Sequence, residues 1–142
     1  MQKQFILFVL IISISSFSFP NQKNKSEYQE GVNHNIRSEF ESSFGEGWQF
    51  LWNLNSTPHR IIGQSIPQEF DAIDPIASEY AAREFIFNYP SLFNIYEENL
   101  DLWVNEQHGN LRYLIFNQVY DNIPVWNGRI DFRYRLNGDL VM

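Results

Sequence analysis

The sequence predicts an α+β fold in which an antiparallel sheet packs against one main helix. Three features point to this class: a capped segment with apolar residues at helical spacing over residues 75–88, strict alternation over residues 129–136, and the tight-turn pair Asn137-Gly138. The chain has 142 residues, which allows one domain and leaves little room for two.

The helix is expected over residues 75–88. Asp74 can cap the free N–H groups of its first turn, and Pro75 suits the first helical position, where its missing N–H would be unsatisfied anyway. Pro90 ends the helix because it disfavours a helical conformation at Tyr89. The apolar stripe that must pack on a sheet comprises Ile76, Ala77, Tyr80, Ala81 and Phe85.

The last third of the chain predicts most of the sheet. A short strand is expected over residues 100–106, and residues 111–120 are apolar at both parities, which is typical of a central strand covered on both faces. A strand over residues 123–136 follows, with a bulge or kink at Asn127-Gly128, and a returning strand begins at Asp139. The inward side chains of the long strand are predicted to be Ile130, Phe132, Tyr134 and Leu136, alternating with Arg129, Asp131, Arg133 and Arg135.

The part before the helix contains fewer signals. Short strands are expected over residues 48–54 and 60–66, joined by a turn. Residues 19–38 are polar and rich in Asn and Gln, and we interpret them as a flexible linker because they can bury little apolar surface. Residues 39–47 are transitional, with room for one helical turn around Phe40 and Phe44. The domain itself is assigned to residues 39–142.

Residues 1–18 predict a secretory signal peptide. Lys3 precedes an apolar run over residues 5–12, and a serine-rich stretch follows. A stable membrane span is not expected, because crossing the hydrocarbon needs about 20 apolar residues. The alternative is an uncleaved anchor. Either route exports the remainder, to the extracellular space or a periplasm.

Composition excludes several classes of function. The formal net charge is -7, whereas nucleic-acid binding requires a basic face. The chain has no cysteine, which excludes disulfides, thiolate nucleophiles and Cys-ligated zinc. The apolar fraction of 44% argues against a disordered acidic chain.

A search for catalytic chemistry finds none. The histidines lack the spacing of an H-E-x-x-H zinc site and are interpreted as solvated residues of the linker and of turns: His34, His59 and His108. Serine-elbow and phosphate-loop motifs are absent. Glu97, Glu98 and Asp101 are interpreted as a solvated acidic turn, and Arg129, Arg133 and Arg135 as a wet strand face rather than an anion site. We therefore expect no catalytic residue, metal or cofactor in this chain.

The tryptophans offer one alternative. An exported domain can use such side chains as a sugar-stacking platform, but their apolar neighbours favour core packing for Trp48, Trp52, Trp103 and Trp126.

Residues 112–130 contain an ordered pattern: an aromatic, Gln, Tyr, an apolar-Pro-Val step and an aromatic, then an alternating strand and a polar-Gly turn. The signature positions are Phe116, Gln118, Tyr120, Pro124, Val125 and Trp126. This pattern resembles the fungalysin/thermolysin propeptide (FTP) domain. The upstream order also fits, so the resemblance covers about residues 48–142. Asn122 stands where the family commonly has Gly, and Asn tolerates the positive φ of such a turn.

The resemblance implies a non-catalytic prosegment of a secreted zinc metallopeptidase, a folding chaperone that also holds the protease inactive until it is cleaved. The implied partner is the catalytic domain of that peptidase, in cis or as a processed fragment. A covalently attached template acts at high effective concentration, which suits slow, non-local folding. The signature residues are expected to be structural. The alternative is a free exported module that recognises a glycan or a peptidase through an aromatic sheet face.

Overall fold

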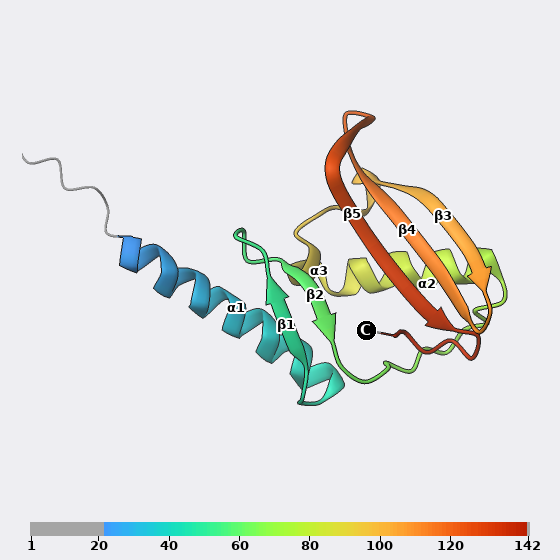
Figure 1. The fold of residues 1–142 in the computed structure, drawn as a ribbon, viewed down its shortest axis with the longest axis horizontal. Helices are drawn as coiled ribbons and strands as arrows, with labels where there is room; N and C mark the ends of the chain where they lie inside the picture. The colour runs from blue at the N-terminus through green and yellow to red at the C-terminus, as the bar shows by residue number, and fades with distance from the viewer. Residues whose placement is uncertain (1–21, 142) are drawn as a thin grey trace, which may run out of the picture.

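The computed structural model describes residues 22–141, and the predicted signal peptide lies outside them. The predicted α+β class with an antiparallel sheet is confirmed (Figure 1). In chain order the elements are α1 (Gln22–Phe44), β1 (Gln49–Trp52), β2 (Pro58–Ile62), α2 (Pro75–Asn88), α3 (Pro90–Phe93), the 3-10 helix η1 (Glu97–Asn99), β3 (Leu100–His108), β4 (Leu111–Tyr120) and β5 (Ile123–Arg135).

The described strands form two antiparallel sheets, one of β1 and β2 and one in the order β3-β4-β5. The central position of β4 was predicted and is confirmed. Its predicted cover on both faces is wrong, because α2 packs on one face only (Figure 1). Leu114 and Phe116 are fully buried on that face, whereas Tyr113 and Ile115 on the opposite face are half-buried.

Helix α2 has the predicted bounds. The Asp74 carboxylate accepts a hydrogen bond from the N–H of Ile76 at 2.8 Å, and Pro75 occupies the first turn. The predicted stripe is wrong at Ile76 and Tyr80, which are 79% and 69% exposed. The helix is instead rotated so that its buried face comprises Ser78, Ala81, Ala82, Phe85 and Ile86. This face also has a spacing of three and four, and it places both Phe85 and Ile86 in the core.

Residues 22–38 are helical, so the predicted linker is wrong over this stretch. The side chains of α1 that approach the rest of the protein recur every four residues, namely Val32, Ile36, Phe40 and Phe44. Phe40 is buried and packs edge-to-face against Trp48 and Phe50, at centroid distances of 5.1 and 5.5 Å. The partners of this stripe lie on the first sheet, which rests on the C-terminal half of α1 (Figure 1). Tertiary packing thus outweighs the polar composition.

The first sheet is shorter than predicted at its far end. Gly63, just after β2, lies so close to the Trp48 ring that a Cβ there would overlap it. The ladder ends at Ile62, and the chain continues as an irregular segment in which Ile66 forms an isolated bridge with Leu140.

Buried Arg112 joins the three-stranded sheet to the segment that precedes α2. Its guanidinium donates hydrogen bonds to the carbonyl oxygens of Ala72 and Ile73, at 2.5 and 2.6 Å, and to the side-chain oxygen of Asn105 at 2.9 Å. The sequence interpretation did not single out this residue. The available signal was its place at the same strand parity as Leu114 and Phe116, which face the core.

Candidate functional site

The outer end of the β4–β5 hairpin is the first candidate site. Its turn residues Asp121 and Asn122 have φ values of 49° and 65°, the left-handed conformation that a two-residue hairpin turn requires. Asn122 therefore tolerates the position where the resemblance leads one to expect glycine. The flanking pair of Tyr120 and Ile123 closes the ladder at this end.

A predicted bulge separates this end from the rest of the hairpin, and it is confirmed. The register shifts between the Asn117–Arg129 pair and the Val119–Pro124 pair, so that β5 has extra residues opposite β4. Gly128 lies within the bulge, and a Cβ there would come within 2.8 Å of the Gln118 side chain and 3.0 Å of Val125. The close packing of Gln118, Val125 and Gly128 thus sets the geometry of the bulge. We call residues 119–127, beyond this contact, the hairpin tip.

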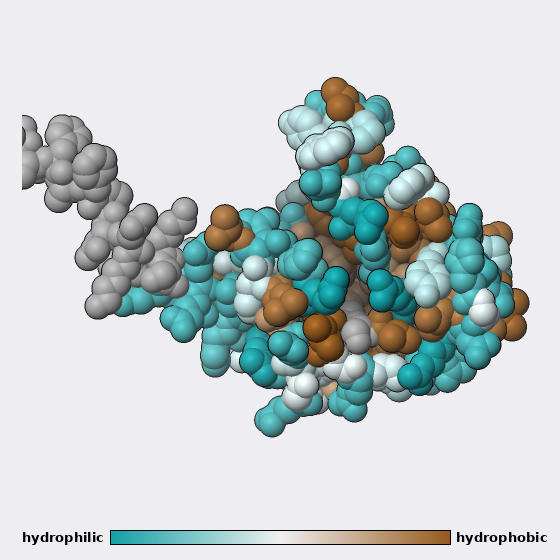
Figure 2. Space-filling view, viewed as in Figure 1, coloured by the Kyte–Doolittle hydropathy of each residue, from teal (hydrophilic) through white to brown (hydrophobic). Residues whose placement is uncertain are grey.

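The hairpin tip presents apolar side chains to solvent. Trp126 is 91% exposed, and Tyr120 and Ile123 are each 69% exposed. Val125 is 38% exposed. Figure 1 shows the hairpin projecting beyond the end of the sheet, and Figure 2 shows hydrophobic surface at its outer end. The core of the protein does not cover these side chains.

The structure divides the six signature residues into two groups. Phe116 is in the core, where the Arg83 guanidinium lies 5.0 Å from its ring centroid. Gln118 is half-buried at the bulge. The exposed group, which lies on the hairpin tip, comprises Tyr120, Pro124, Val125 and Trp126.

The prediction of core packing holds for Trp48, which is 3% exposed, and is wrong for Trp103 and Trp126. The two errors have different causes. Trp126 lies in the bulge of β5, where the regular alternation is interrupted. Trp103 alternates with Leu102, which packs on the core, and therefore lies on the face of the sheet that α2 does not cover. Trp103 is 62% exposed as a result.

The other chemistry-bearing residues are not brought together. His34 lies on α1, whereas His59 lies within β2 and His108 ends β3, so the predicted linker and turn placements are wrong. His108 contacts the Glu106 carboxylate at 3.1 Å. Glu98 and Asp101 are exposed, as expected for a solvated turn. Within residues 22–141 there is no group of three or more His, Asp or Glu side chains arranged to hold a metal ion.

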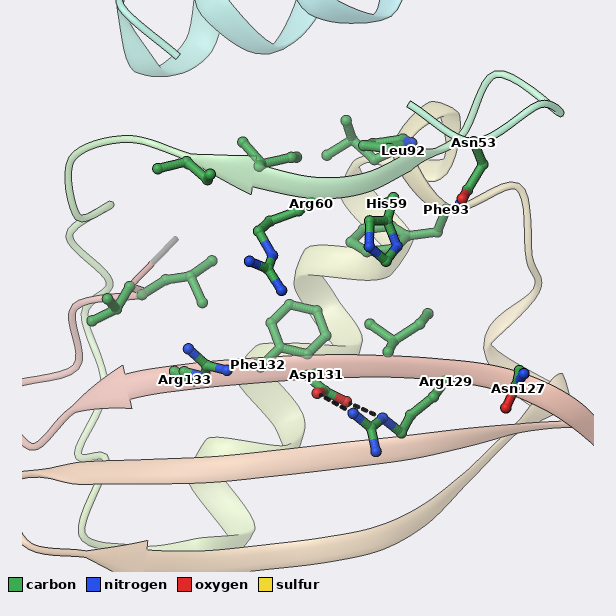
Figure 3. A pocket seen from close by; sticks show the side chains of 16 residues that line it. Asn53, His59, Arg60, Leu92, Phe93, Asn127, Arg129, Asp131, Phe132 and Arg133 are labelled. Carbon is green, nitrogen blue, oxygen red and sulfur yellow. Dashed lines mark hydrogen bonds and ion pairs between the residues drawn. The ribbon is translucent and has the colours of Figure 1, made fainter. Parts of the chain in front are cut away.

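The second candidate site is a cleft between the facing edges of β2 and β5, with a volume of about 1110 Å³. His59 and Arg60 point from β2 toward β5 (Figure 3). On β5, Arg129 and Asp131 form an ion pair at 2.8 Å, and Phe132 lies between the two strands. The sequence did not reveal this cleft, because its walls are far apart along the chain.

The chain matches no protein-family model, no curated protein and no solved structure. The FTP resemblance therefore depends on the residues quoted above. Among the described helices, none combines the length and apolar character needed to cross a bilayer.

Proposed function

We propose that residues 39–142 act as a non-catalytic prosegment that binds the catalytic domain of a secreted zinc metallopeptidase, assists its folding and holds it inactive. The sequence support is the FTP-like pattern of β4 and β5. The observation that carries the proposal is the hairpin tip, where Trp126 and Tyr120 are exposed on a hairpin whose other end is anchored in the core. An exposed apolar surface of this kind binds an apolar face of a partner. The partner proposed here is the catalytic domain while it folds.

The tip is well suited to this task. Phe116 and Phe132, at the inner end of the hairpin, pack edge-to-face with ring centroids 6.2 Å apart. The tip residues are therefore presented on a supported element, which reduces the entropy lost on binding. A tryptophan that becomes fully buried in an interface commonly contributes about 2 kcal/mol or more to affinity. Among the large apolar side chains of the hairpin tip, Trp126 has the largest exposed fraction, 91%, and is therefore the candidate for that role.

The test is to mix the purified chain with the catalytic domain of a thermolysin-type zinc metallopeptidase. We expect saturable inhibition of peptide hydrolysis and a higher yield of active enzyme after dilution from guanidinium. Trp126→Ala should weaken the inhibition by about tenfold or more, because an anchor of this kind contributes over 1.4 kcal/mol. Trp103→Ala is the matched control, since Trp103 is also exposed but lies away from the tip.

Stability measurements make the result interpretable. Both tryptophan variants should unfold within about 0.5 kcal/mol of the parent chain, as exposed substitutions do. Equal effects of the two substitutions on inhibition, or no inhibition by the parent chain, would contradict the proposal. Zinc-dependent peptide hydrolysis by the chain itself would also contradict it.

The exposure of Trp103 favours a second candidate, a free exported module that binds a glycan by aromatic stacking. Tyr113 lies on the same uncovered face of the sheet and contacts the Arg133 guanidinium at 5.9 Å from its ring centroid. A titration with soluble oligosaccharides, followed by tryptophan fluorescence, separates the two functions. Saturable glycan binding that Trp103→Ala abolishes would favour the module over the prosegment.

A further inference from the structure

The cleft between β2 and β5 is bounded by two strand edges. Among the described strands, β2 pairs only with β1 and β5 only with β4, so each has a free edge on its other side. Backbone N–H and C=O groups on a free edge can pair with a further strand. The two edges run in the same direction and face each other across the cleft (Figure 3).

One end of the cleft already holds such a strand. Leu140 forms antiparallel bridges with both Ile66 and Tyr134. The N–H groups of Leu140 and Ile66 donate to each other's carbonyl oxygens at 2.8 Å, and the N–H of Val141 donates to the carbonyl oxygen of Arg133 at 2.7 Å. At this end the gap is therefore one strand wide, which is roughly twice the 4.8 Å strand spacing.

The hydrogen bonds of this short strand show which groups of β5 face the cleft. The N–H of Arg135 donates to Asp139 and the carbonyl of Arg133 accepts from Val141, so both point away from β4. Because hydrogen-bonding direction alternates along a strand, the backbone groups of Arg129 and Asp131 point the same way. The edge of β5 is therefore set to accept an antiparallel strand alongside Arg129–Arg133.

The side chains around the cleft favour an acidic occupant with alternate apolar residues. The cleft is lined by three arginines and one histidine, namely Arg60, Arg129, Arg133 and His59. Its one acidic lining residue, Asp131, already forms an ion pair with Arg129. Within the described part of the chain, Arg60 makes no ion pair. Phe132 and Phe93 supply apolar lining on the inner side. The cleft is thus a basic region on a chain whose net charge is -7.

We propose that this cleft binds an extended acidic segment of another polypeptide, which adds to β5 as an antiparallel strand in line with Asp139–Val141. Backbone pairing would supply affinity, and the arginines would select acidic side chains at alternate positions. This surface meets the hairpin tip at Asn127 but includes neither Tyr120 nor Trp126, so the proposal does not depend on the proposed function.

The probe is a fluorescein-labelled peptide that alternates glutamate and valine over about seven residues, enough to span roughly 24 Å as a strand. Fluorescence anisotropy should show saturable binding to the full chain. N-methylation of alternate peptide bonds should weaken binding about tenfold, since two lost backbone hydrogen bonds amount to about 1.4 kcal/mol or more. A peptide with lysine in place of glutamate should not bind. Equal affinity for the N-methylated peptide would overturn the proposal.

Protein variants locate the binding edge. The N–H of Asp131 points into the cleft, so Asp131→Pro removes a donor to the incoming strand while leaving the pairing with β4 intact. We expect the D131P substitution to abolish peptide binding and D131A, its control, to retain it. If D131P unfolds the protein, Arg60→Glu provides the second test, with a loss of about tenfold, whereas Arg37→Glu on α1 should have no effect. Unchanged binding in Arg60→Glu would overturn the proposal.

Two further measurements exclude other occupants and other sites. Trp126→Ala should bind the peptide as tightly as the parent chain, because Trp126 does not line the cleft, and weaker binding would contradict the assignment. Sedimentation velocity without peptide should show a monomer. A dimer that D131P dissociates would instead assign the β5 edge to a second copy of this chain.

Discussion

At the scale of single residues, Arg112 is the charged side chain on which the fold depends. It is 6% exposed, and its hydrogen-bond acceptors are the carbonyl oxygens of Ala72 and Ile73 and the amide oxygen of Asn105. A buried guanidinium is tolerated only where such acceptors replace water. Arg112 thereby fixes the start of α2 relative to β4 and satisfies carbonyl groups that lie outside any ladder.

Replacing Arg112 by Met should therefore be costly. The substitution preserves much of the apolar volume but leaves buried carbonyl oxygens without donors, at about 1–3 kcal/mol each. We expect the free energy of unfolding to fall by about 3 kcal/mol, measured by urea denaturation. Arg133→Met is the control, since Arg133 is exposed on the neighbouring strand and should cost less than about 0.5 kcal/mol. Equal losses in the two variants would mean that the carbonyl contacts do not stabilise the fold.

For Tyr134, in contrast to Arg112, removing the buried polar group is not expected to lower the stability. Its side chain is fully buried, and no described residue forms a hydrogen bond with its hydroxyl group. Tyr134→Phe removes that unpaired group and should change the free energy of unfolding at neutral pH by between zero and about +1 kcal/mol. A loss of stability of more than about 1 kcal/mol would show that the hydroxyl has a stabilising partner.

The same residue sets the alkaline stability. Burial raises the pKa of Tyr134 above its usual value, so the unfolded chain ionises this phenol near pH 10 while the folded chain keeps it neutral. The unfolded state then binds fewer protons, and stability falls by about 1.4 kcal/mol for each pH unit above 10. Thermal unfolding between pH 9 and pH 11 should show a steeper decline for the parent chain than for Tyr134→Phe. Parallel curves would contradict this assignment.

At the scale of elements, α1 is the segment for which amino-acid composition and tertiary packing predict different structures: composition predicts a flexible linker, whereas packing gives a helix. Gly31 lies within this helix, and a Cβ there would meet nothing within 4 Å. Gly31→Ala should therefore stabilise α1 by about 0.5–1 kcal/mol, the usual gain at an exposed helical position. The measurement is circular dichroism at 222 nm together with thermal unfolding. If residues 22–38 were the linker that composition indicates, the substitution would change neither signal.

The elements that could be predicted are those with local causes. The bounds of α2 follow from Asp74, Pro75 and Pro90, and the central position of β4 follows from its apolar residues at both parities. The helical state of α1 could not be read in the same way, because Phe40 gains its partners, Trp48 and Phe50, from a sheet that forms elsewhere. The four-residue spacing of Val32, Ile36, Phe40 and Phe44 is visible in the sequence, but the polar composition of the segment favoured its interpretation as a linker.

At the scale of the whole molecule, the features that could not be predicted from the sequence are those formed by segments that lie far apart along the chain. The cleft has one wall from β2 and another from β5, and no motif in either strand reveals the other. The sequence predicted the turn between β4 and β5 and core packing for Trp126, whereas the exposure of Trp126 follows from the bulge and from the lack of a covering element. Strand alternation predicts which side a residue faces, and it says nothing of whether that side is covered.

The pairing of Leu140 with Ile66 also bears on the order in which the molecule assembles. The β3-β4-β5 ladder joins strands that are consecutive in sequence, and each hairpin closes a short loop at small entropic cost. The Leu140–Ile66 bridge closes a loop that contains that entire meander and α2. We therefore expect this long-range bridge to form after the local hairpins of the meander.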